Sequence, residues 1–134
     1  MSRKSRVIEV TPPPADYWSF QTYTHAWFDA GDYANRITSP NMEQAYQGPD
    51  GKVWMVVAHQ DPGMQNWIDT EGRQRAVVTH RWLHAKAAAE PKARLVKFAQ
   101  LQQYLPADLP SMSPDQRRQQ IAVRQRHVQH RFHN

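Results

Sequence analysis

The chain of 134 residues is long enough to bury one hydrophobic core, because 40% of its residues are hydrophobic and five are tryptophan. It contains no cysteine, which excludes disulfide bonds, thiolate nucleophiles and cysteine zinc sites. The net charge of +5 would attract polyanions, but the excess lies at the C-terminus, where five Arg and three His follow Asp115 without another acidic side chain.

No stretch of the sequence is apolar enough to span a membrane. The longest uncharged apolar run, residues 53–58, falls far short of the roughly 20 residues that a membrane-spanning helix needs. The basic N-terminus is followed by Glu9 and a proline run, not by the apolar region of a signal peptide. We therefore expect a cytoplasmic protein without a membrane span.

Residues 1–15 are predicted to form an extended arm outside the domain. They combine basic side chains, a short β-prone patch at residues 7–10, and three prolines at residues 12–14 that favour polyproline II. Such a segment usually links domains or packs along a neighbour.

Two strands are predicted next. Residues 17–24, YWSFQTYT, are rich in aromatic and hydroxyl side chains, which suit a half-buried pleated surface. A shorter strand is predicted at residues 33–38, because a turn precedes it at Gly31 and Pro40 follows it.

The clearest local signal predicts a hairpin. The turn cluster QGPDG at residues 47–51 separates residues 44–46 from the run at residues 52–60. Within residues 53–58, VWMVVA, both alternating faces are apolar, so this strand is predicted to be central. A central strand of this kind indicates a sandwich or layered core.

The remaining part of the domain contributes two further predicted strands, at residues 75–83 and 93–98. A short helical turn is predicted around Leu101, and two prolines then end the domain. The predicted sandwich therefore spans residues 16–110.

Residues 111–134 are predicted to form a basic helical extension. Ser113 is a typical N-cap, Pro114 suits the first helical position, and Gln116 completes a capping box. The predicted helix runs from Pro114 to about Phe132. Its apolar stripe is thin, so we expect it to dock weakly or not at all and to be dispensable for stability.

Five short motifs resemble the bacterial family of domains of unknown function numbered 1214. They are YWSFQ at 17–21, DYANR at 32–36, DPG at 61–63, NWIDTEG at 66–72 and RW at 81–82. The resemblance implies a mostly β fold, a jelly-roll-like antiparallel β-sandwich at the C-terminal end of longer proteins, here with the N-terminal extended arm and the C-terminal α-helix. It implies no established activity and supplies no catalytic residues.

The connection at residues 61–72 allows two interpretations. Asn66 offers an amide beside the flat ring of Trp67, a combination that suits sugars, so both are candidate ligand-binding residues. Alternatively, the segment is a structural plug in which Trp67 closes the open end of the sandwich and Asp61 or Asp69 binds loop N–H groups.

A hydrolase-like site is a competing hypothesis. His59 and Asp61 have the form of a His–carboxylate pair for acid–base work, with Arg81 as the anion-binding group, although no nucleophile lies beside them in the sequence. Arg36 is a further candidate ligand-binding residue, because a guanidinium can bind an anion. The alternative for both arginines is an internal ion pair with an aspartate. The candidate aspartates are Asp32, Asp61 and Asp69.

No metal site and no cofactor are expected. His80 and His84 are four residues apart on a predicted strand, which separates them by about 13 Å, too far to share one ion. His127, His130 and His133 recur every three residues on the predicted helix, but they are exposed and lack carboxylate support.

A third hypothesis assigns polyanion binding to the C-terminal helix, whose arginines could contact phosphates. At about 100° per residue they spread over several faces without a recognition motif, so the sequence does not favour nucleic acid as a partner. These arginines are Arg117, Arg118, Arg124, Arg126 and Arg131.

The leading hypothesis is a non-catalytic β-sandwich module. It would pack on a partner domain, or bind a small polar, sugar-like ligand through Asn66, Trp67 and neighbouring aromatic side chains. We expect the partner to be an upstream domain that is absent from this chain or separately encoded.

Overall fold

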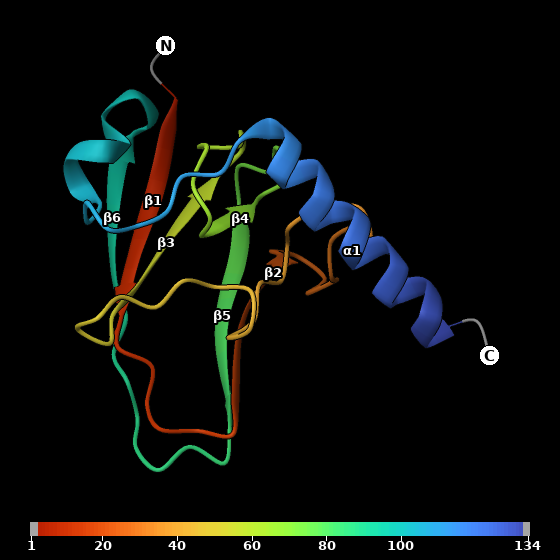
Figure 1. The fold of residues 1–134 in the computed structure, drawn as a ribbon, viewed down its shortest axis with the longest axis horizontal. Helices are drawn as coiled ribbons and strands as arrows, with labels where there is room; N and C mark the ends of the chain where they lie inside the picture. The colour runs from red at the N-terminus through yellow and green to blue at the C-terminus, as the bar shows by residue number, and fades with distance from the viewer. Residues whose placement is uncertain (1–2, 133–134) are drawn as a thin grey trace.

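Two β-sheets and a C-terminal helix form the fold in a computed structural model that describes residues 3–132 (Figure 1). The larger sheet has the strand order β4-β3-β1-β6, and the smaller sheet pairs β2 with β5. The elements are β1 (Lys4–Val10), β2 (Tyr17–Thr24), β3 (Val53–Ala58), β4 (Trp67–Asp69), β5 (Ala76–Leu83), β6 (Lys92–Lys97), the 3₁₀ helix η1 (Phe98–Tyr104) and α1 (Pro114–Phe132). The predicted mostly β, sandwich-like fold with a C-terminal helix is confirmed, and its jelly-roll connectivity stays a prediction.

The N-terminal segment departs from the predicted arm, because β1 is an inner strand of the larger sheet (Figure 1). β1 pairs antiparallel with β3 and with β6, so that Ile8 lies opposite both Met55 and Ala93. Its side chains alternate, with Ser5 and Val7 buried and Arg6 exposed. The basic residues on the exposed side hide this alternation in the sequence. The boundary predicted after residue 15 therefore does not separate the arm from the sheet.

β3 is confirmed as a central strand. It pairs in parallel with β4 on one side and antiparallel with β1 on the other. The predicted partner at residues 44–46 is wrong, because this segment forms turns while residues of β1 and β4 occupy both edges of β3. The turn itself is present, with the N–H of Gly48 donating to the carbonyl of Lys52 at 2.9 Å.

Each face of β3 contributes to a separate hydrophobic cluster, as its alternating pattern predicts. One cluster lies between the larger sheet and the β2–β5 sheet and contains Val53, Met55, Val57, Ile8 and Phe20. The other, called the cluster beneath η1, contains Val7, Val56, Ala58, Trp67 and Leu101, with Trp54 partly buried at its margin. The larger sheet is therefore covered on both faces.

Most other predicted elements form at their expected places. β2 has the predicted bounds, and β5, β6 and the turn of η1 lie where they are predicted. The strand predicted at residues 33–38 is wrong, because this segment forms turns. Asp32 holds the first turn by accepting from the backbone N–H of Asn35 at 3.3 Å. The carbonyl of Ile37 accepts the N–H of Asp69 at 2.8 Å, which ties the segment to β4.

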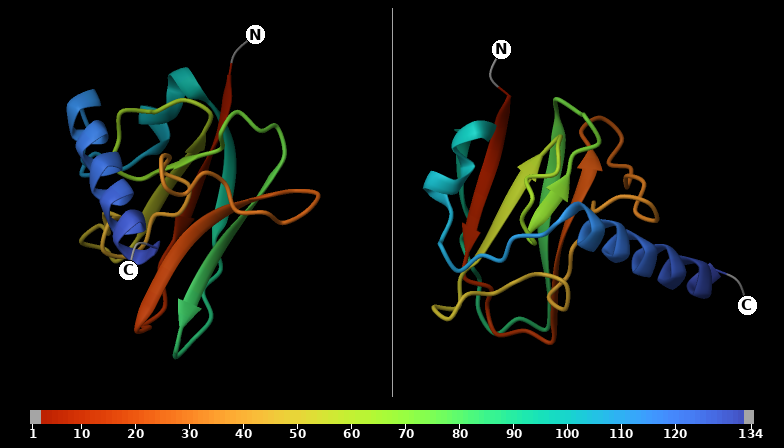
Figure 2. Two further views of the ribbon diagram at one scale, coloured as in Figure 1. Left: turned by 90° about the vertical axis from the view of Figure 1, so that its right-hand side faces the viewer. Right: turned by 45° about the horizontal axis from the view of Figure 1, so that its top comes forward.

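The helix α1 has the predicted bounds and the predicted capping box. The N–H of Gln116 donates to Oγ of Ser113 at 3.2 Å, and the N–H of Ser113 donates to Oε1 of Gln116 at 2.8 Å. α1 starts against the larger sheet and its C-terminal end extends away from it (Figure 2). Within residues 3–132, no helix is long and apolar enough to cross a membrane.

The expectation that α1 docks weakly is wrong. Arg117 and Arg124 are only 4% and 8% exposed, and Ile121 between them packs against the cluster beneath η1. These residues are three and four positions apart, so they share one face of the helix. The sequence prediction considers only the apolar residues of the helix. It misses this face because arginine side chains form most of it.

One histidine is part of the core between the sheets. His80 of β5 stacks on Phe20 with ring centroids 4.2 Å apart, and its Nδ1 accepts the indole N–H of Trp82 at 3.0 Å. This hydrogen bond selects the neutral tautomer that carries its proton on Nε2. Burial lowers the pKa of His80 from 6.5 to about 4.

We expect His80 to make the protein less stable in mild acid. Between pH 6.5 and about 4 the unfolded chain binds a proton at His80 and the folded chain does not, so the free energy of unfolding falls as the pH falls. Allowing for partial exposure, the loss from pH 7 to 4.5 is about 2 kcal/mol.

Urea unfolding at both pH values should show this loss of unfolding free energy in the natural protein and not in His80→Phe. His130→Phe, an exposed control, should keep it, and equal losses in the natural protein and His80→Phe would contradict the assignment.

Candidate functional site

Asn66, a predicted ligand-binding residue, is an internal tie and only 1% exposed. Its Oδ1 accepts the N–H of Tyr46 at 2.7 Å, and its Nδ2 donates to the carbonyls of Tyr46 at 2.8 Å and Trp54 at 3.0 Å. Asn66 thus joins the turn segment around Tyr46 to β3 through its side chain. The predicted hairpin would have joined the same two segments through backbone hydrogen bonds. Its amide oxygen and both amide hydrogens are used, which corrects the expectation that it contacts a ligand.

Trp67, the second predicted ligand-binding residue, lies in the plug arrangement. It is 7% exposed, and its indole N–H donates to the carbonyl of Ala58 at 3.2 Å. The guanidinium of Arg117 lies 5.0 Å from the ring centroid and holds Asp61 in a two-pronged ion pair at 2.9 and 3.1 Å. It also donates to the carbonyl of Met64. α1 therefore closes over the ring that would have stacked on a sugar.

Arg36 forms the internal ion pair that was the alternative to anion binding. Its Nε and Nη2 donate to the carboxylate of Asp69 at 2.7 and 3.1 Å. The hydrogen bond to Asp69 raises the pKa of Arg36, and Asp69 itself is buried. The pair fixes the turn before Ile37 to β4, so its role in the structure is to hold the fold.

The three residues of the hydrolase hypothesis do not converge. His59 is exposed and its Nδ1 contacts the hydroxyl of Thr70, whereas Asp61 is held by Arg117 and Arg81 lies 5.4 Å from the ring centroid of Tyr23. His59 lines a cavity of about 650 Å³ between the two sheets, and neither Asp61 nor Arg81 lines it. An acid–base pair needs its members within hydrogen-bonding reach, which these positions do not provide.

The histidines of the described part of the chain do not gather into a metal site. Among residues 3–132, no three His, Asp or Glu side chains are grouped so that they could hold an ion. His80 lies against Phe20, and Nδ1 of the exposed His84 contacts the carboxylate of Asp16 at 2.8 Å. His127 and His130 are exposed on α1, and His133 lies outside the described residues.

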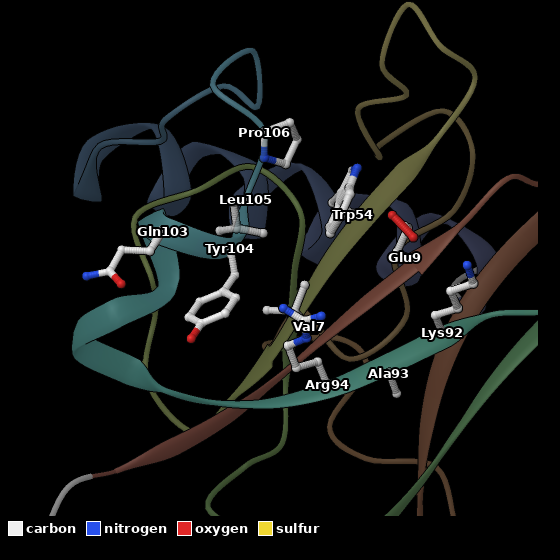
Figure 3. A pocket seen from close by; sticks show the side chains of 10 residues that line it. All are labelled: Val7, Glu9, Trp54, Lys92, Ala93, Arg94, Gln103, Tyr104, Leu105 and Pro106. Carbon is white, nitrogen blue, oxygen red and sulfur yellow. The ribbon is translucent and has the colours of Figure 1, made fainter.

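A groove of about 510 Å³ is the best candidate for a binding site (Figure 3). It lies over β1, β3 and β6 where the cover formed by η1 ends. Trp54 and Tyr104 are the aromatic residues that line it, and Leu105 and Pro106 form a further side (Figure 3). Its volume is within the range of about 300–1,000 Å³ that is usual for small-ligand sites.

Strand register places the polar residues of the groove. Glu9 of β1 lies opposite Trp54 of β3 and opposite Lys92 of β6, and Val7 lies opposite Arg94. Because opposed residues and those two apart share a face of the sheet, these side chains all face the groove. The end of η1 adds Gln103 and Tyr104.

The groove combines flat aromatic surface with hydrogen-bonding groups of both kinds. The Arg94 guanidinium lies 5.4 Å from the ring centroid of Tyr104. Glu9 is at the groove margin and accepts from Nζ of Lys52 at 3.5 Å. Gln103 can donate and accept, while Lys92 and Arg94 donate. This arrangement can hold a small molecule with an apolar face and a hydroxyl-rich edge.

Sequence reasoning places Val7 and Glu9 in a β-prone patch and Trp54 and Arg94 in predicted strands, but it does not bring them together as a site. Apart from Trp54, the residues that line the groove come from β1 and, much later in the chain, from the consecutive segments β6 and η1 and the residues directly after them. The alternating burial of β1 would have pointed to the groove, but the basic residues on its exposed side hide this pattern in the sequence.

Comparison with known proteins supports the resemblance. The family model described as "Protein of unknown function (DUF1214)" matches residues 5–87, which include β2 through β5 and all but the first residue of β1. The chain is also similar to an uncharacterised protein from Burkholderia cenocepacia of known crystal structure, with a TM-score of 0.66 and 34% sequence identity. That similarity covers 74% of this chain and 28% of the other. No curated protein matches the chain at a significant level.

Proposed function

The chain belongs to the DUF1214 family of proteins of unknown function, and from the groove over β1, β3 and β6 we propose that it is a non-catalytic binding module. Its ligand is a small polar molecule of the sugar class, held in the groove over β1, β3 and β6. The observation that carries the proposal is the presence of Trp54 and Tyr104 beside Glu9 and Gln103 in one cavity (Figure 3).

The chemistry of the groove suits a sugar because a pyranose has both an apolar C–H face and a polar rim. The rings of Trp54 and Tyr104 offer apolar surface for the C–H face. The carboxylate of Glu9 and the amide of Gln103 offer hydrogen bonds to the hydroxyl groups of the polar rim. The proposal is non-catalytic because His59, Asp61 and Arg81 are engaged with separate partners.

We expect Tyr104→Ala to weaken sugar binding at least tenfold. The ring lies at the end of η1, partly exposed, so its removal deletes one aromatic wall and leaves both hydrophobic clusters in place. Saturation-transfer NMR against glucose, galactose and N-acetylglucosamine would identify a bound sugar, and titration of its signals would give the affinity of each protein. A tenfold loss corresponds to about 1.4 kcal/mol of binding free energy.

Tyr33→Ala is the matched control, since Tyr33 has similar exposure and does not line this groove. It should bind the sugar as the natural protein does. Absence of binding by all three sugars, or equal losses in Tyr33→Ala and Tyr104→Ala, would overturn the assignment of the groove.

A second candidate function, packing on a partner domain, is supported by Trp27 and Phe28. Trp27 is 83% exposed, and Phe28 is held in a left-handed conformation at φ 58° while it stacks on Tyr23 at 4.4 Å. The turn is fixed by Thr24, whose Oγ1 accepts the N–H of Asp29 at 2.9 Å. The occupant would be another domain of a longer family member, because the related chain extends well beyond the matched part. Under this function Trp27→Ser would abolish association with that domain and leave sugar binding unchanged.

A further inference from the structure

The two buried arginines of α1 differ in how their charges are balanced. Arg117 pairs with the carboxylate of Asp61, whereas Arg124, seven residues later on the same helix face, meets only neutral acceptors among the described residues. Arg124 donates through Nη1 and Nη2 to groups of Tyr33, Ser39 and Gln44 at 2.9–3.4 Å. Its Nε is buried and has no hydrogen-bond partner within residues 3–132.

A buried guanidinium without a counter-charge is costly. Burial lowers the pKa of Arg124, and the residue is only 8% exposed. Buried charges are normally paired with an opposite charge, as Arg117 is. The buried guanidinium of Arg124 therefore lacks an opposite charge among the described residues.

Arg124 lines a cavity of about 420 Å³ between α1 and β2. His127 and Arg131, about one and two turns further along α1 than Arg124, line the same cavity together with Tyr17, Tyr33 and Asn41. None of the described residues that line it is acidic. The cavity thus offers two guanidinium groups, phenol hydroxyls and an amide, with no carboxylate to compete for them.

We propose that this cavity binds a small organic anion whose carboxylate or phosphate group is held by Arg124. Arg131 adds long-range attraction at the exposed end of the cavity, and Tyr17 and Tyr33 line the space for the body of the ligand. The four Nη hydrogens of Arg124 are already donated to Tyr33, Ser39 and Gln44, so its unpartnered Nε–H is the donor that remains for the oxyanion. Arg131, which lines the same cavity, can add a pair of N–H donors. This site is separate from the groove over β1, β3 and β6, so it does not depend on the sugar proposal.

Benzoate and phenyl phosphate are suitable probes, because each joins one oxyanion to one aromatic ring. Calorimetric titration of the full chain should detect binding of at least one probe, and the tighter one identifies the preferred head group. The ¹H–¹⁵N signal of Arg124 Nε should shift during the same titration. Arg124→Leu should lose the binding, and its stability is measured alongside, because the change also leaves the acceptors on Tyr33, Ser39 and Gln44 without their donor.

Arg131→Gln and Arg126→Gln form a matched pair that removes the same charge from the same helix. Both residues are exposed, and only Arg131 lines the cavity. We expect Arg131→Gln to weaken binding at least fivefold and Arg126→Gln to change it by less than twofold. Failure of both probes to bind, equal effects of the two variants, or full binding by Arg124→Leu would each overturn the proposal. If Arg124→Leu does not fold, the shift of the Arg124 Nε signal and the comparison of Arg131→Gln with Arg126→Gln still test whether the cavity binds the anion.

Discussion

Trp67→Ala is expected to lower the free energy of unfolding by about 3 to 5 kcal/mol, comparable to the whole stability of many small domains. Trp67 packs in the cluster beneath η1, donates to the carbonyl of Ala58 and lies under the guanidinium of Arg117. Its truncation would open a cavity and leave that guanidinium without the ring. Equilibrium urea unfolding followed by far-UV circular dichroism would measure the loss.

Trp27→Ala is the matched control, because it makes the same chemical change at a side chain that is 83% exposed. Exposed substitutions of this kind usually alter stability by no more than about 0.5 kcal/mol. A well-folded Trp67→Ala protein with nearly natural stability would show that Trp67 does not act as a plug.

Arg117→Ala is expected to lower the free energy of unfolding by about 2 to 4 kcal/mol. Removing one member of a buried ion pair leaves the other charge uncompensated, which usually costs about 3 to 5 kcal/mol. We expect a smaller loss of stability than this usual cost, because the side chain of Asp61 is 32% exposed and water can partly replace the arginine. The carbonyl of Met64 also loses its donor. Thermal and urea unfolding would both report the change.

Arg118→Ala provides the control for this second substitution, since Arg118 follows Arg117 and forms only an exposed ion pair with Asp115. Such surface pairs contribute about 0 to 1 kcal/mol. If both variants lose equally little, α1 is as loosely attached as its apolar residues alone suggest. Removal of residues 113–134 would then also be harmless, which we do not expect.

Local patterns in the sequence predict the elements well where one segment contains the whole signal. The aromatic and hydroxyl residues of β2, the two apolar faces of β3 and the capping box at Ser113 are all local, and each prediction is confirmed. In each case the residues that make the pattern also make the structure, so no distant partner has to be known.

Long-range pairing is what the sequence does not reveal. The hairpin prediction assigned the edge of β3 to residues 44–46 because a turn joins them, yet β1 and β4 have that role. Asn66 looked free to bind a ligand, and it is instead the side chain that replaces the missing backbone ladder to Tyr46. Likewise, Arg117 and Arg124 look like surface charges until Asp61 and Ser39 are known to face them.

The inner position of β1 has a consequence for how the protein is made. β1 is synthesised before both of its partner strands, but Arg6 pairs with Leu95, so its second neighbour is synthesised almost ninety residues later. At about 5–20 residues per second this delay is roughly 5 to 20 s. During that time an apolar strand remains without one of its neighbours, and such exposed edges favour aggregation. The nascent chain should therefore depend on chaperones more than a protein whose sheet is assembled from consecutive hairpins.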